Sequence, residues 1–212
     1  MGKFIKGILG GFSGKIGNVI GAYHRGVDYM RSLPRKSSKA ATLPQLNQRM
    51  RFKTVMGFLR PIVAFIRVGY QMYKGTETPF NAAVAYHLEN AVTGVYPNLV
   101  IDFAEVRLSK GDLLQVYQAE VSTEVGHELK LDWLNNAGPL SPELTDEATV
   151  VVYNPMKDLF VALQGAAVRS ALTYTLALPG DFVGDQVHVY MYFVGAKRSS
   201  ESVYLGAVTV IA

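Results

Sequence analysis

Short runs of residues that are alternately apolar and polar, or mostly apolar, fill the chain from about Leu99 onward. Alternation over runs of five to ten residues predicts β-strands that bury one face. Turn-forming stretches rich in Gly, Pro, Asn and Asp separate the runs, and no helical pattern interrupts them, which is typical of an antiparallel β-sandwich. The predicted strands are Leu99–Leu108, Leu113–Ser122, Glu128–Leu134, Ala148–Tyr153, Leu159–Leu163, Ala171–Leu178, Gln186–Val194 and Ser202–Ile211. Trp133, the single tryptophan, is expected in the sandwich core.

A helical period of three and four residues precedes the strands. Thr42 is a suitable N-cap for a helix that starts at Leu43, with Pro44 in its first turn. Pro61 is expected to kink or split this helix, because proline lacks the amide hydrogen that the helix ladder needs. A second helix is expected over Pro79–Val92, capped by Thr78.

The first 21 residues contain seven glycines, with apolar residues recurring between them at intervals of three and four. The spacing suits an amphipathic helix, either close-packed or on a membrane surface, but each glycine costs about 1 kcal/mol in a helix interior. A loop that becomes a strand near Gly17 is therefore favoured. We interpret the segment as an arm that orders against a partner. The expected arm residues are Phe4, Ile5, Ile8, Leu9, Phe12, Ile16, Val19 and Ile20.

Two short runs, Val19–Tyr23 and Val27–Arg31, flank a tight connection containing Gly26 and predict a β-hairpin. The predicted fold is thus mainly β with a helical segment. Its expected parts are a basic Gly-rich arm with hairpin and linker (1–41), two helices (42–97), and an antiparallel immunoglobulin- or fibronectin-like sandwich (98–212).

Charge is distributed unevenly along the chain. Residues 1–75 contain 14 Lys or Arg and one acid, Asp28, whereas residues 76–212 contain 7 Lys or Arg and 16 acids. The asymmetry indicates either an anionic partner or an acidic surface on a neighbouring subunit, with solubility as the simpler explanation. The bases expected to form a contact stripe are Arg25, Arg31, Arg35, Lys36, Lys39, Arg49, Lys53, Arg60 and Arg67.

Catalytic motifs are missing from the sequence. No cysteine is present, so disulfides, thiolate metal sites and cysteine nucleophiles are excluded. The stretch at Gly14-Lys15 fails as a phosphate loop, because Leu9 and Ile16 stand where Gly and Ser or Thr are required. The four histidines lie far apart and no Gly-x-Ser-x-Gly motif occurs. We therefore expect no enzyme, no cofactor and no metal site.

Targeting signals are also not expected. The apolar residues after Lys6 are interrupted by glycines too early for a signal peptide. The most apolar helical stretch, Val55–Val68, carries Arg60, Pro61 and Arg67, so the chain is not expected to be an integral membrane protein. A cytoplasmic protein or a component of an assembled particle is expected.

The N-terminal third resembles an uncharacterised bacterial family classed as a domain of unknown function. The resemblance rests on the Gly-rich stretch Gly10–Gly21, on His24–Pro34, and on Gln45–Phe52 with Gln48 and Arg49. Similar openings are associated with phage-derived or prophage regions. The resemblance implies no activity, cofactor or catalytic residue, but it favours a particle or filament component.

Three functional hypotheses follow. The first is a non-catalytic structural subunit that assembles with itself head to tail through its basic N-terminal arm. The second is a nucleic-acid-binding protein that uses the basic stripe. The third is a carbohydrate- or protein-binding sandwich whose site is the face carrying Tyr190 and Tyr192.

Overall fold

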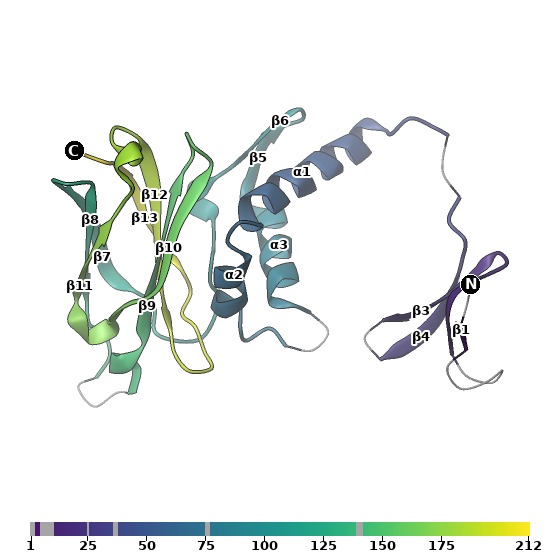
Figure 1. Ribbon diagram of the computed structural model, residues 1–212, viewed down its shortest axis with the longest axis horizontal. Coiled ribbons are helices and arrows are strands. Elements are labelled where there is room, and N and C mark those ends of the chain that lie inside the picture. The colour runs from purple at the N-terminus through teal and green to yellow at the C-terminus, as the bar shows by residue number, and fades with distance from the viewer. Residues whose placement is uncertain (1–2, 5–10, 25, 36–37, 75–76, 139–141) are drawn as a thin grey trace. The chain divides into compact units, whose positions relative to one another are not determined.

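The computed structural model divides into two compact units, Met1–Thr42 and Leu43–Ala212, which we call the N-terminal unit and the body. It describes residues 3–4, 11–24, 26–35, 38–74, 77–138 and 142–212 (Figure 1).

The N-terminal unit forms a four-stranded antiparallel sheet, the N-terminal sheet, in the order β1-β2-β3-β4. Gly17 begins the two-residue connection between β2 and β3 with a φ of +58°, a conformation that glycine adopts without strain. The expected hairpin is present as β3 and β4, but the segment before Gly17 is a strand from Phe12 rather than a loop. The strands are β1 (Lys3–Phe4), β2 (Phe12–Ile16), β3 (Val19–His24) and β4 (Val27–Ser32).

Three helices begin the body where two were expected: α1 (Leu43–Leu59), α2 (Val63–Gly69) and α3 (Pro79–Asn90). The break between α1 and α2 contains Pro61, in agreement with the missing amide hydrogen and the steric clash of a proline inside a helix. The Thr78 side chain accepts a hydrogen bond from the Asn81 amide at 3.3 Å, as expected for the N-cap of α3.

The strands of the body form a hairpin and two larger sheets. The three-stranded sheet has the order β11-β8-β7 and the four-stranded sheet the order β10-β9-β12-β13. The bounds are β5 (Val92–Val95), β6 (Asn98–Ile101), β7 (Tyr117–Glu124), β8 (Glu128–Leu134), β9 (Glu147–Asn154), β10 (Leu159–Val168), β11 (Thr173–Ala177), β12 (Gln186–Val194) and β13 (Val203–Thr209).

Several expected elements differ from those observed. The second helix, expected to reach Val92, ends at Asn90, and Val92 begins β5, which was not expected. β10 continues five residues beyond the expected Leu163.

The run Leu99–Leu108 is a strand only to Ile101, because the Asp102 carboxylate caps a short 3-10 turn by accepting from the Ala104 amide at 3.1 Å. The run Leu113–Ser122 becomes a continuous strand only at Tyr117.

The two larger sheets of the body form a β-sandwich around one buried core. Leu131 and Trp133 of β8 pack with Val189 and Phe193 of β12 in this core. Trp133 is buried as expected, and its indole Nε1 donates to the Arg169 carbonyl at 2.8 Å. The ring of Trp133 therefore fills the core while its polar atom has a partner.

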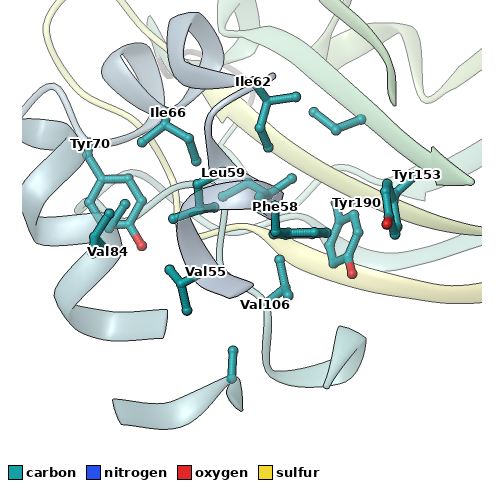
Figure 2. Packing of buried hydrophobic residues seen from close by; sticks show 14 of the residues in the cluster. Val55, Phe58, Leu59, Ile62, Ile66, Tyr70, Val84, Val106, Tyr153 and Tyr190 are labelled. Carbon is teal, nitrogen blue, oxygen red and sulfur yellow. The ribbon is translucent and has the colours of Figure 1, made fainter. Parts of the chain in front are cut away.

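The helices cover the other face of the four-stranded sheet and create a second core (Figure 1). Figure 2 shows Phe58 of α1 lying beside Tyr190 of the sheet, and the Phe58 ring lies edge-on to the Tyr153 ring with the centroids 5.1 Å apart. The Tyr192 hydroxyl donates to the Phe65 carbonyl at 3.3 Å. The tyrosine face of β12 is therefore occupied by the helices, which corrects the third hypothesis: this face is not free to bind a ligand.

Candidate assembly surfaces

The N-terminal sheet exposes apolar side chains on both faces. Tyr29 and Met30 are neighbours on β4, so they point to opposite faces, and they are 43% and 72% exposed. In residues 11–24 and 26–35, Gly21 alone is buried, and the Phe12 ring lies against it so closely that no larger residue fits. The exposed large apolar residues of the sheet are Ile16, Val19, Tyr23, Val27, Tyr29 and Met30.

A sheet of this kind lacks the interior that normally stabilises strands. Hairpins and small sheets in water need a hydrophobic face packed against another layer. Contiguous exposed apolar residues on a folded protein mark interaction surfaces. The N-terminal sheet is therefore a candidate contact surface for a second molecule.

The expected arm residues fall partly on this sheet. Phe12, Ile16, Val19 and Ile20 lie on β2 and β3, where Ile16 pairs with Val19 across the turn. Ile5, Ile8 and Leu9 lie outside the described residues. For Phe4 the structure gives only its position in β1, paired with Phe12.

The expected basic stripe is divided between the two units. Arg31, Arg35 and Lys39 are exposed in the N-terminal unit, while Arg25 and Lys36 lie outside the described residues. The other four bases are exposed in the body, and in the described part of the chain no carboxylate forms an ion pair with them. These four are Arg49, Lys53, Arg60 and Arg67.

A groove of about 450 Å³ lies in the body between α1, β6 and the turn from β9 to β10. Its walls are mainly apolar and include Met50, Phe58 and Ile101. In the wall of the groove the Tyr153 hydroxyl donates to Asp158 Oδ1 at 2.9 Å. The pKa of Tyr153 is raised mainly by burial and, to a smaller extent, by this hydrogen bond. The groove offers a shaped apolar surface rather than a nucleophile with an adjacent base.

His87 is buried in the body, and both of its ring nitrogens form hydrogen bonds with the backbone. His87 Nδ1 lies 2.7 Å from the Ala83 carbonyl, and its Nε2 accepts from the Arg107 amide at 3.3 Å. This pattern requires the neutral ring with the proton on Nδ1, and burial lowers the pKa of His87. Within the described residues, no three His, Cys, Asp or Glu side chains gather as metal ligands, and no helix could span a membrane.

One protein family matches nearly the whole chain. The model of DUF6266, a family of unknown function, matches residues 11–206 and so includes β2–β4 of the N-terminal sheet and the sandwich as far as the middle of β13. The chain belongs to this family. The family match therefore spans residues of both the N-terminal unit and the body.

Among solved structures, fibronectin type III domains are similar to part of this DUF6266 protein. The fn3 domain of human collagen alpha-1(XX) chain is 19% identical, over 47% of this chain and 86% of that domain, with a TM-score of 0.31. The fn3 domain of human contactin 1 is 11% identical, over 57% of this chain and 94% of that domain, with a TM-score of 0.33. No curated protein matches the chain in sequence.

Two surfaces of this DUF6266 protein were not expected from its sequence. The groove brings together residues from around positions 50, 101 and 155, which no local pattern connects. The exposure of both faces of β4 was also missed, because an apolar strand normally indicates a buried face. The one available signal was the concentration of bases and glycines around these apolar residues.

Proposed function

We propose that this protein is a non-catalytic structural subunit that assembles with copies of itself through the N-terminal sheet, in a filament or a phage-like particle. The observation that carries the proposal is the exposure of Tyr29 and Met30 on opposite faces of one strand. Burial of that apolar surface against a neighbouring copy would supply the interior that the sheet lacks.

Charge supports the same contact. Residues 1–42 contain eight Lys or Arg and one acid, whereas residues 43–212 contain 13 Lys or Arg and 16 acids. A basic N-terminal unit on one copy and an acidic body on the next attract each other. A contact between two different surfaces repeats head to tail and builds a ring or a filament.

Light scattering of the full chain tests the proposal. The wild-type protein is expected to show a mass that rises with concentration, while Met30→Glu on β4 is expected to remain at the mass of one chain. Val125→Glu is the matched control, because Val125 is 80% exposed in the body. The control should assemble like the wild type. A wild-type protein of one chain mass at all concentrations would overturn the proposal.

Nucleic-acid binding is a second candidate, favoured by the four exposed bases of the body that have no ion pair among the described residues. Arg49 and Lys53 lie one turn apart on α1, where both side chains can reach one phosphate backbone. The affinity for a mixed-sequence DNA duplex should then fall as the salt concentration rises. A plot of the logarithm of the association constant against the logarithm of the salt concentration should have a slope of about −0.9 for each phosphate neutralised.

Charge reversal at α1 provides the test of this second candidate. Arg49→Glu with Lys53→Glu should weaken DNA binding and flatten its salt dependence, whereas Lys197→Glu at an exposed position of the β12–β13 turn should not. Equal affinities for the two variants would count against nucleic-acid binding by this surface.

A further inference from the structure

One edge of the four-stranded sheet in the body carries few of the features that usually protect a sheet edge. β10 is the strand at this edge, and β13 is the strand at the opposite edge. The ten residues of β10, Leu159–Val168, contain no charged residue and no proline, and the shift in its register lies after Gln164. Natural sheets usually protect an edge with lysine, proline, a bulge or a covering segment, because the outer amide and carbonyl groups are free to pair with another chain. The edge strand β7 of the other sheet carries Glu120 and Glu124 instead.

The first six residues of β10 form a regular edge. Leu159–Gln164 pair in continuous register with β9, and the register shifts only between Gln164 and Val168. Phe160 packs against the core under the helices and Val161 against the sandwich core, so both faces hold the strand in place. A fixed strand is a preorganised template for pairing.

Apolar side chains lie exposed along this edge. Leu159 and Leu163 share a face with Val161, because alternate residues of a strand point the same way. They are nevertheless 50% and 38% exposed. A strand added to β10 would cover these two leucines and satisfy the outward-pointing backbone groups of the edge at the same time.

The N-terminal sheet offers a strand of matching length. β4 is an edge strand of that sheet, and its six residues, Val27–Ser32, equal the regular part of β10. All six are exposed, and the basic N-terminal unit complements the excess of acids in the body. No other protein is needed to supply the strand, since every copy of the chain carries one.

We propose that β10 of one copy receives β4 of a second copy, so that the two four-stranded sheets join into one across the contact. The inference rests on the proposed self-assembly and names its acceptor surface. Because β4 and β10 are different strands, each copy can donate its β4 to one neighbour and accept β4 of another on its β10. Growth then continues head to tail.

Mixing two variants tests the pairing. Met30→Glu damages the donor strand but leaves β10 intact, and Leu163→Lys places a charge on the acceptor edge but leaves β4 intact. Each variant alone should have the mass of one chain, and an equimolar mixture should form a dimer and nothing larger. Leu134→Lys, at a 51% exposed leucine on the central strand β8, is the matched control and should assemble like the wild type.

The results of these experiments distinguish the pairing of β4 with β10 from self-assembly in general. A monomeric wild type overturns both. Wild-type assembly together with full assembly of Leu163→Lys, or a mixture that stays monomeric, overturns the β10 pairing and leaves self-assembly through another surface.

Amide hydrogen exchange adds a readout that does not depend on the folding of a β10 variant. Alternate amides of Leu159–Gln164 should exchange at least about tenfold more slowly in assembled wild type than in monomeric Met30→Glu. Equal exchange of these amides in the two samples contradicts the pairing.

Discussion

The N-terminal sheet and the four-stranded sheet of the body have the same number of strands and antiparallel pairing throughout. In the body, β9 and β12 are almost entirely buried, because the three-stranded sheet covers one face and the helices cover the other. In the N-terminal unit, every residue of β4 is exposed. Backbone pairing is thus similar in the two sheets, and the difference lies in what covers them. Within the described residues of its unit, the N-terminal sheet lacks the buried interior that the four-stranded sheet of the body has.

Truncation of an aromatic residue should produce the largest contrast between the two regions. Trp133→Ala is expected to lower the free energy of unfolding of the body by about 3–5 kcal/mol, since it leaves a cavity in the sandwich core. Tyr23→Ala on the N-terminal sheet should change it by less than about 0.5 kcal/mol, because Tyr23 is exposed. Denaturant unfolding of the monomer at low concentration measures both values, and similar losses would remove the distinction.

Acid should weaken the body through His87. Because burial lowers the pKa of His87 in the folded state, the unfolded chain binds the proton first as the pH falls. The contribution of the neutral His87 ring to the free energy of unfolding is therefore fully present above the ordinary histidine pKa of 6.5. Below that pH the free energy of unfolding decreases, by at most about 1.4 kcal/mol per pH unit for this group. Burial also lowers the pKa of His188, which adds to the decrease.

Denaturant unfolding between pH 5 and 8 checks the histidine prediction. His87→Gln should flatten the decrease, while His24→Gln, at an exposed position of β3, should leave it as in the wild type. An unchanged slope in His87→Gln would show that the acid sensitivity arises elsewhere.

Removal of one hydroxyl group gives the smallest expected effect. Tyr192→Phe loses the hydrogen bond to the Phe65 carbonyl that links the sheet to the helices, at a cost of about 1 kcal/mol. Tyr29→Phe on β4 should not change the unfolding free energy of the body. Thermal unfolding of both variants measures the difference, and equal stabilities would mean that the Tyr192 hydroxyl does not help to hold the helices.

Local sequence signals predicted much of the fold. Thr78 followed by Pro79 marked the start of α3, and Pro61 marked the break after Leu59. Alternation located β8 closely, from Glu128 to Leu134. Each signal depends on neighbours along the chain, which is why a single sequence carries it.

The surfaces could not be predicted in the same way. Val150–Tyr153 of β9 reads as a continuous apolar run, which is typical of a strand buried on both faces, but the run does not say that helices supply the second cover. The edge position of β10 depends on the order of strands in the sheet. Both faces of β4 are exposed because no other layer covers them within the described part of the N-terminal unit. Apolar residues in a strand usually indicate a buried face, so the sequence did not predict this exposure.

Amide hydrogen exchange of the full chain at low and high protein concentration tests the central claim most directly. The amides of β12 should be strongly protected at both concentrations, because their protection comes from the two cores of the body. The amides of β3 and β4 should exchange rapidly when the protein is dilute and become protected as concentration rises. Protection of β3 and β4 equal to that of β12 in dilute protein would contradict the account, because the N-terminal sheet would then be stable without a partner.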